Sequence, residues 1–192
     1  MENKRCFIIA EAGVNHNGDI GLAYKLIDAA KEAGVDCIKF QTFKTEKVIS
    51  KNTEMASYQK ENLQNKDTQY EMVKKLELSY ENFKDLKNYC QKVGIQFLST
   101  PDEEESLDFL VDKLNMEIIK VGSGELTNYP YLKKIALKNK EIIISTGMSN
   151  LSEIERALEC IRKYNNKEIN YKEYCILITV LLYAMILVLW RR

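Results

Sequence analysis

The sequence predicts an α/β protein made of successive βα units with parallel strands, and two observations lead to this fold class. Apolar segments of strand length alternate with longer segments whose apolar residues recur at helical spacing. Polar groups suited to binding anions or moving protons follow five of the apolar segments, in residues 11–18, 41–42, 99–101, 122–125 and 146–148. An open doubly wound sheet and a segment of a (β/α)8 barrel both fit, and both place ligands at the carboxyl ends of the strands.

The first three units are predicted from apolar spacing and from glycines that end helices. Strands are expected at residues 6–10, 37–40 and 96–99. The helices between and after them are expected at residues 20–33, 79–93 and 103–114. Their apolar residues recur at helical spacing, and Gly34 and Gly94 follow the first two helices, where a glycine commonly forms the C-cap.

The last two βα units repeat the order of strand and helix, and a long polar insertion follows the second strand of the chain. Strands are expected at residues 118–121 and 142–146, and helices at 131–138 and from Asn150 to Tyr164, where Asn150 and Glu153 have the spacing of a capping pair. Residues 44–70 are polar and charged, and a loop this long inside a compact domain usually has a function. We expect it to extend over the mouth of an active site.

Composition excludes several classes of protein. The 192 residues suffice for one domain, and the balance of 28 basic and 28 acidic residues gives no reason to expect a nucleic-acid partner. Five scattered cysteines and a single histidine argue against a disulfide framework and a zinc site, and fit a cytoplasmic protein. The first apolar stretch is only about five residues long, so no export signal is expected.

Residues 169–192 differ from the rest and are expected to form an unrelated apolar tail behind a domain of residues 1–168. The run from Cys175 to Trp190 is unbroken in its apolar character, which predicts an apolar C-terminal helix. A membrane-spanning helix needs about 17–25 apolar residues, so the run lies at the lower limit. Three interpretations remain open: a tail anchor in contact with a membrane, a buried tail, or the product of a frameshift.

Two lysines inside apolar strands, Lys39 and Lys120, indicate an anion-binding site. An unpaired buried ammonium is costly, so each must reach an anion or form an ion pair with a neighbouring Glu. Residues 122–125 (Gly-Ser-Gly-Glu) add backbone N–H groups and the Ser123 hydroxyl, and Thr100 and Ser145 add hydroxyls from neighbouring strands. Together these residues favour a small phosphorylated ligand.

Glu11 and His16 are the candidates for proton transfer. Glu11 follows the first apolar segment and could act as a general base, a metal ligand or a hydroxyl acceptor, although an acid that only braces the loop is an alternative. His16 lies in a polar turn and is either a catalyst or an ordinary loop residue. No Walker A loop, GxGxxG turn or G-x-S-x-G elbow is present, which argues against hydride transfer and serine hydrolysis.

Five motifs together resemble those of the sialic acid synthase family, which includes N-acetylneuraminate synthase and its legionaminate and pseudaminate relatives. They are residues 9–18 (Ile-Ala-Glu-Ala-Gly-Val-Asn-His-Asn-Gly), 38–43 (Ile-Lys-Phe-Gln-Thr-Phe), 97–101 (Phe-Leu-Ser-Thr-Pro), 120–125 (Lys-Val-Gly-Ser-Gly-Glu) and 144–148 (Ile-Ser-Thr-Gly-Met). The resemblance implies a (β/α)8 TIM barrel with a small antifreeze-like domain, in a domain-swapped homodimer. It implies condensation of phosphoenolpyruvate with an N-acetylated aldose such as N-acetylmannosamine, assisted by Mn²⁺ or Mg²⁺. Among the products, sialate and legionaminate fit better than pseudaminate.

The resemblance also assigns roles to individual residues. It implies that phosphoenolpyruvate is held by Lys39, Thr100, Lys120, Ser123 and Ser145. It places Glu11 by the metal and its water, and Glu125 against the sugar. Asp102 and Glu103 depart from the family, which usually has Phe and then Asp after the Ser-Thr-Pro turn.

The resemblance stops near Glu168, before the two histidines that bind the metal in the family. We therefore expect a partial (β/α)8 barrel of about five βα units with little or no synthase activity of its own. The alternative is a non-catalytic partial barrel that binds a phosphorylated ligand or is tethered to a membrane.

Overall fold

Strands and helices alternate through the part of the chain that the structure describes. The computed structural model describes residues 7–51 and 68–165. Its strands are β1 (Ile9–Gly13), β2 (Cys37–Thr42), β3 (Gln96–Pro101), β4 (Ile118–Val121) and β5 (Glu141–Ile144). Its α-helices are α1 (Ile20–Glu32), α2 (Thr45–Val48), α4 (Gln69–Lys74), α5 (Tyr80–Val93), α6 (Glu104–Asp108), α7 (Tyr129–Leu137) and α8 (Leu151–Tyr164). A π-helical turn, η1 (Phe109–Lys113), extends α6, and a 3-10 turn, η2 (Ser123–Glu125), follows β4.

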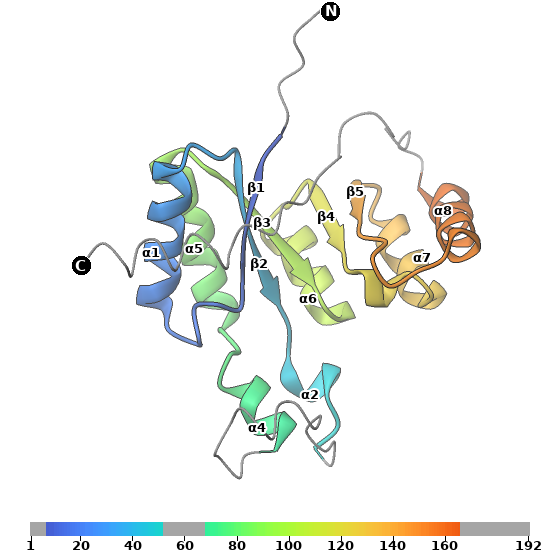
Figure 1. Ribbon diagram of the computed structural model, residues 1–192, viewed down its shortest axis with the longest axis horizontal. Coiled ribbons are helices and arrows are strands. Elements are labelled where there is room, and N and C mark those ends of the chain that lie inside the picture. The colour runs from blue at the N-terminus through green and yellow to red at the C-terminus, as the bar shows by residue number, and fades with distance from the viewer. Residues whose placement is uncertain (1–6, 52–67, 166–192) are drawn as a thin grey trace, which may run out of the picture.

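All strand pairs are parallel, as the sequence predicts. One sheet has the order β1-β2-β3 and the other pairs β4 with β5, and β3 lies against β4. Figure 1 shows α2 and α4 beyond the carboxyl end of β2. Because parallel strands end at the same edge of a sheet, the polar residues at their carboxyl ends gather on this side.

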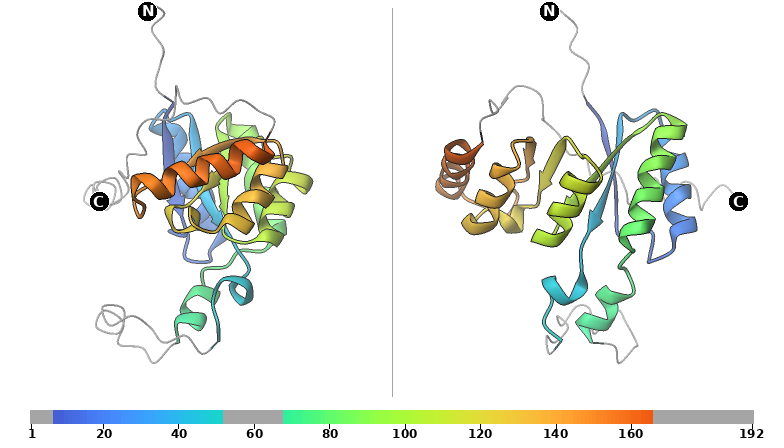
Figure 2. Two further views of the ribbon diagram at one scale, coloured as in Figure 1. Left: turned by 90° about the vertical axis from the view of Figure 1, so that its right-hand side faces the viewer. Right: turned by 180° about the vertical axis from the view of Figure 1, so that it is seen from behind.

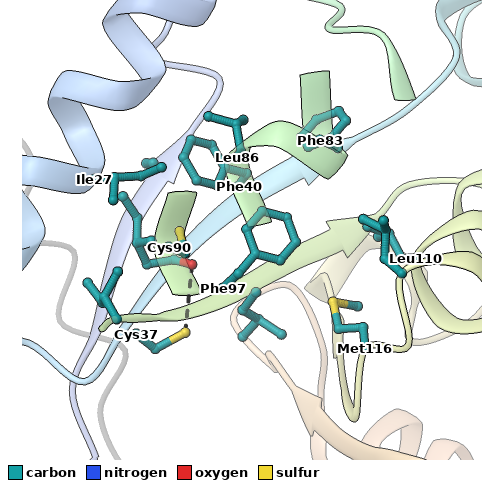
Figure 3. Close-up of a cluster of buried hydrophobic side chains, with 14 of the residues drawn as sticks. Ile27, Cys37, Phe40, Phe83, Leu86, Cys90, Phe97, Leu110 and Met116 are labelled. Atoms are coloured by element: carbon teal, nitrogen blue, oxygen red, sulfur yellow. Dashed lines mark hydrogen bonds between the residues drawn. The ribbon is translucent and has the colours of Figure 1, made fainter. Parts of the chain in front are cut away.

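Apolar side chains between the strands and the helices form two hydrophobic clusters. The larger joins β2 and β3 to α1 and α5, and Figure 3 shows Phe40 and Phe97 close to Ile27 and Leu86. The smaller joins β4 and β5 to α7 and α8, with Ile119 and Leu132 fully buried. Figure 2 shows, from behind, α1 and α5 side by side and α8 at the opposite end of the molecule. The helices therefore lie outside the strands.

The helix boundaries confirm the predicted caps at Gly94 and Asn150, whereas the C-cap of α1 is Ala33 and the predicted Gly34 follows it with a positive φ. Ser79 and Asn82 form a capping box at the start of α5, and Gly94 ends that helix in the left-handed conformation. Asn150 and Glu153 form the same box at the start of α8. These contacts satisfy backbone N–H groups that have no partner within the helix, so local sequence determines where these helices begin.

Several predicted boundaries were wrong. The first strand is displaced from 6–10 to Ile9–Gly13, so Glu11 lies within β1 and pairs in register with Lys39 instead of following the strand. The helix predicted at 103–114 is divided, because its second half is the π-helical η1. The loop predicted at 44–70 contains α2 and the start of α4. The end of the first strand was misplaced because hydropathy excludes the polar Glu11. Pairing with β2 nevertheless keeps Glu11 in the strand.

Some predictions fall outside the described residues. These are the apolar helix and tail anchor of residues 169–192 with the Cys175–Trp190 run, and the loop segment 52–67. Among residues 7–51 and 68–165, no helix is long and apolar enough to cross a membrane. Among the described residues, Cys37, Cys90 and Cys160 are free thiols.

Candidate active site

Glu11, Lys39 and Thr100 connect three adjacent strands at the carboxyl side of the sheet. Lys39 Nζ lies 2.5 Å from Glu11 Oε2 and donates a hydrogen bond of 3.3 Å to Thr100 Oγ1. Lys39 is 4% exposed, and its register partner across β1 is Glu11. Both predictions for this lysine meet here: it forms an ion pair with a neighbouring Glu, and it lies beside a hydroxyl that could bind an anion together with it.

Lys120 forms a second cationic centre next to the first. Its Nζ donates to Ser145 Oγ at 2.5 Å and to the Val121 carbonyl at 2.7 Å. Burial and the charge of Lys39 together lower the pKa of Lys120 to about 8, against the opposing effects of Glu11 and Asp102. Lys120 has no carboxylate ion pair among the described residues. A bound anion would therefore stabilise the charged form of Lys120, which burial and Lys39 disfavour.

Ser123 and Glu125 lie in the same short turn after β4 but have different surroundings. Both lie in η2, which the backbone bond from Glu125 N to the Gly122 carbonyl closes at 3.1 Å. Glu125 Oε2 accepts a 2.8 Å bond from Asn128, the N-cap of α7, and Glu125 lines the neighbouring pocket. Ser123 is half-buried, and the hydrogen bonds of Lys39 and Lys120 within the described residues go to other partners.

Asp102 was not among the predicted site residues, yet it lies at the centre of these charges. Its backbone N–H donates to the Thr42 carbonyl at 3.0 Å, which extends the β2–β3 pairing. The Tyr131 hydroxyl donates to the carbonyls of Pro101 at 2.8 Å and Glu103 at 3.2 Å, which holds the turn on both sides of Asp102. Burial raises the pKa of Asp102 to about 7, opposed by Lys39 and reinforced by Glu125, Glu103 and Glu11. A carboxyl directly after a strand was the only sequence signal for this residue.

A pocket of about 580 Å³ opens beside these groups, between the strand ends and the α2–α4 segment. One wall is largely apolar and includes Val14, Phe43, Val48, Ile49, Val73 and Leu76. The acidic lining residues, which we call the acidic wall, are Asp102, Glu103, Glu104 and Glu125. Residues 44–51 and 68–70 lie in or next to the segments that build the apolar wall. Lys47, Val48 and Ile49 of the predicted loop 44–70 line this pocket, and its extension over an active site stays a prediction.

Glu77 holds the α2 side of the pocket in place. It accepts bonds from Thr45 N at 2.9 Å and Thr45 Oγ1 at 2.7 Å, and forms ion pairs with Lys74 at 2.8 Å and Lys44 at 3.5 Å. Burial alone would raise the pKa of Glu77, but the bonds from Lys74 and Thr45 outweigh it and lower the pKa to about 2. The Glu77 carboxylate therefore connects α2, through Thr45, with α4, through Lys74.

His16 lies apart from the lysines. It is 1% exposed, and its ring faces Phe40 at a centroid distance of 6.2 Å. Because side chains alternate along a strand, Phe40 and Lys39 face opposite sides of β2, so His16 lies on the helix side. Its Nδ1 accepts a 3.1 Å bond from Gly18 N, and its Nε2 is buried without a partner among the described residues. The predicted catalytic role of His16 stays a prediction that this position does not favour.

The described residues do not form a binding site for the divalent metal that the resemblance implied. Within residues 7–51 and 68–165, no three His, Cys, Asp or Glu side chains lie where they could share an ion. Glu11, predicted to lie beside the metal, is engaged by Lys39. The described residues therefore do not fit a divalent metal.

Sequence comparison places the chain among known proteins. The model of the NeuB family matches residues 26–184, which is most of the chain. The chain belongs to the NeuB family.

The NeuB-family relatives include enzymes with several product names. The chain is 47% identical over 173 residues to the N,N'-diacetyllegionaminic acid synthase of Legionella pneumophila, covering 90% of this chain and 48% of that protein. It is 51% identical over 167 residues to the protein of the same name from Campylobacter jejuni, covering 87% and 50%. It is 38% identical over 160 residues to the N-acetylneuraminate-9-phosphate synthase of Mus musculus, covering 83% and 44%. The chain thus spans about half the length of the curated relatives it matches.

A solved structure of the family has the same arrangement of strands and helices. The N-acetylneuraminic acid synthetase of Leptospira borgpetersenii, in complex with citrate, superposes with a TM-score of 0.72 at 34% identity, covering 84% of this NeuB-family chain and 52% of that one. A truncated 3-deoxy-D-arabino-heptulosonate 7-phosphate synthase from Thermotoga maritima gives a TM-score of 0.58 at 17% identity, a likeness of fold alone.

Proposed function

We propose that this NeuB-family chain acts in nonulosonate synthesis and joins phosphoenolpyruvate to an N-acetylated aldose. The observation that carries the proposal is the pair of buried lysines, Lys39 and Lys120, each bonded to a hydroxyl at a neighbouring strand end. Buried cations with adjacent hydroxyl groups suit a small phosphorylated carboxylate, because charge-assisted hydrogen bonds are strongest away from water. The five βα units are inferred to form part of a (β/α)8 barrel.

Each residue of the cluster has a distinct part in this proposal. Lys120 and Ser145 bind one end of phosphoenolpyruvate, and Lys39 and Thr100 bind the other, with Ser123 at the edge of the site. Glu11 holds Lys39 in position through their ion pair. In the reaction, C3 of phosphoenolpyruvate attacks the aldehyde of the open-chain sugar, water adds at C2, and phosphate leaves by cleavage of its C–O bond.

The second substrate is proposed to occupy the adjoining pocket. The pocket joins an apolar wall to an acidic one, a combination that suits a molecule with both an acyl group and hydroxyl groups. Glu125 lies in the acidic wall, where the family resemblance places a sugar contact. The names of the relatives leave open whether that sugar carries a phosphate, since one group is named for an unphosphorylated product and another for a 9-phosphate.

Calorimetric titration with phosphoenolpyruvate tests the proposal directly. The wild-type chain is expected to bind it, and Lys120→Met to bind about 100-fold more weakly, because one charged hydrogen-bonding group is lost from a buried site. Lys140→Met is the matched control, since Lys140 pairs with Glu117 next to the opposite end of β5. Equal affinities in wild type and Lys120→Met would contradict the proposal.

Phosphate release separates catalysis from binding. The same chain is incubated with phosphoenolpyruvate, N-acetylmannosamine and Mn²⁺. Release that requires the sugar and is lost in Lys120→Met supports the synthase. Binding without release supports the second candidate, a non-catalytic protein that binds a phosphorylated ligand, because the lysine cluster needs no metal to attract an anion.

A further inference from the structure

We propose that Asp102 is a specificity-determining residue of the pocket, and that it makes the pocket favour an uncharged, hydroxylated sugar over a sugar phosphate. The inference rests on the proposed function, because it concerns the second substrate of that reaction. It addresses the choice that the names of the relatives leave open.

Asp102 lies where the anion site and the pocket meet. It lines the pocket, and it interacts electrostatically with Lys39 of the anion site and with Glu125 of the acidic wall. The Tyr131 hydroxyl and the bond from Asp102 N to the Thr42 carbonyl fix its backbone. The backbone position of Asp102 is therefore set by the fold, which keeps its side chain at the lining of the pocket.

The other three carboxylates of the acidic wall already have partners. Glu103 accepts bonds from the backbone of Ser106 and Glu105 and so caps α6. Glu104 forms an ion pair with Lys134, and Glu125 accepts a bond from Asn128. Asp102, by contrast, has no side-chain hydrogen bond or ion pair within residues 7–51 and 68–165. Its carboxyl has unused capacity to accept a hydrogen bond from a sugar hydroxyl.

The same wall repels an anion. A phosphate in the pocket would meet Asp102 together with Glu103, Glu104 and Glu125, whereas Lys47 is the one basic residue among the described lining residues. A unit charge several ångströms away in a partly buried site changes anion affinity by on the order of tenfold. Charge thus separates the two substrates: the lysines take the anionic one, and the acidic wall takes the neutral one.

The preference for a neutral sugar should rise with pH. The titratable groups that interact electrostatically with Asp102 are Lys39 from β2, Lys120 from β4, Glu11 from β1, Tyr131 from α7, Glu103 from its own turn and Glu125 from η2. Because burial raises the pKa of Asp102 to about 7, its negative charge develops as the pH rises through neutrality. A sugar phosphate also gains charge near pH 6, so the contribution of Asp102 is the part that an uncharged substitution removes.

The test is a pair of titrations of the full 192-residue chain saturated with phosphoenolpyruvate. The probes are N-acetylmannosamine and N-acetylmannosamine 6-phosphate, at about pH 8, where Asp102 should be ionised. Wild type is expected to prefer the neutral sugar. In Asp102→Asn this preference should fall about tenfold, mainly through tighter binding of the phosphate. Asp102→Ser is a second uncharged variant, so that a folding defect in one leaves the test intact.

Asp108→Asn is the matched control, because Asp108 lies on α6, is exposed and pairs with Lys138 away from the pocket. It should leave the preference unchanged. An unchanged preference in both Asp102 variants would overturn this inference alone. No binding of either sugar to a chain that binds phosphoenolpyruvate would overturn this inference and the synthase proposal together, and would favour the non-catalytic candidate. Failure to bind phosphoenolpyruvate would overturn the proposed function and this inference with it.

Discussion

Glu11 Oε2 lies 2.5 Å from Lys39 Nζ, and the two residues are register partners across β1 and β2. Lys39 is almost fully buried, while the Glu11 side chain is 19% exposed. The pair therefore has a dry cation and an anion that water reaches in part. An anionic ligand could approach Lys39 from the solvent side and interact with it together with Glu11. Because the Glu11–Lys39 pair connects β1 with β2, binding of an anion should affect the stability of this sheet.

Substitution of Glu11 by Gln should destabilise the protein and increase its response to anions. The change leaves Lys39 buried without its charge partner, at a cost of about 2 kcal/mol in the free energy of unfolding. Inorganic phosphate should then raise the melting temperature more in the variant than in wild type, because it replaces the lost charge. Thermal unfolding with and without phosphate measures both effects. The control Glu117→Gln breaks the exposed pair with Lys140, and equal phosphate shifts in all three proteins would contradict the prediction.

Phosphoenolpyruvate affinity should weaken as the pH rises above about 8, where Lys120 begins to lose its proton. The pKa of Lys120 lies below its ordinary value of 10.5, so the folded protein releases this proton before the unfolded chain does. Stability consequently increases with pH between about 8 and 10.5, while anion binding decreases. Lys120→Met should remove both pH dependences. Calorimetry and urea unfolding at several pH values measure them, and a variant that keeps the wild-type profile would refute the assignment.

Acid should destabilise the fold through His16. Burial lowers the pKa of His16 below its ordinary 6.5, so its stabilising contribution is complete above that pH and is lost as the pH falls through the folded-state pKa. Protonation would also remove the Nδ1 acceptor of Gly18 N. His16→Asn keeps an acceptor near the Nδ1 position but does not titrate. The unfolding free energy of this variant should change less between about pH 7 and pH 5 than that of wild type. An identical pH dependence of the two proteins would count against this role.

Gly18 should not tolerate a side chain. Its φ is +76°, and a Cβ would collide with the Lys75 carbonyl, which belongs to the segment after α4. Gly18→Ala is expected to cost about 2–4 kcal/mol, since the clash adds to the backbone penalty. Gly34→Ala is the control: Gly34 has nearly the same φ, +72°, with open space around it, and should lose only about 1 kcal/mol. Urea unfolding compares them, and equal losses would show that the loop moves aside.

Glu77→Gln should loosen α2 and the apolar wall of the pocket. Thr45 and Lys74 would lose their charged partner, for about 2 kcal/mol of unfolding free energy. The low pKa of Glu77 means that this contribution is present above 4.5 and is lost as the pH falls toward about 2. Amide hydrogen exchange of residues 45–49 should rise in the variant. Glu46→Gln, which removes an exposed partner of the same Lys74, should leave exchange nearly unchanged. Similar exchange in both variants would contradict the anchoring role.

Local sequence was sufficient for most of the architecture. The parallel βα order, the start of α8 at Asn150 and the end of α5 at Gly94 follow from patterns within a few residues of each element. Lys39 and Lys120 were recognised as site residues because a lysine inside an apolar strand demands a partner. Boundaries that depend on pairing were less predictable, as with β1, which includes the polar Glu11 because a register partner on β2 compensates its charge.

The sequence by itself determined which residues face the carboxyl side of the sheet, because strand period and strand direction are local properties. Only the tertiary structure decided how they associate: Lys39 with Glu11, Lys120 with Ser145, and Asp102 at the border of the pocket. It also moved His16 to the opposite side of β2, against Phe40. These outcomes depend on contacts between segments far apart in the chain and on burial, which sets the charge of each group, and neither is encoded in the spacing of residues along one strand.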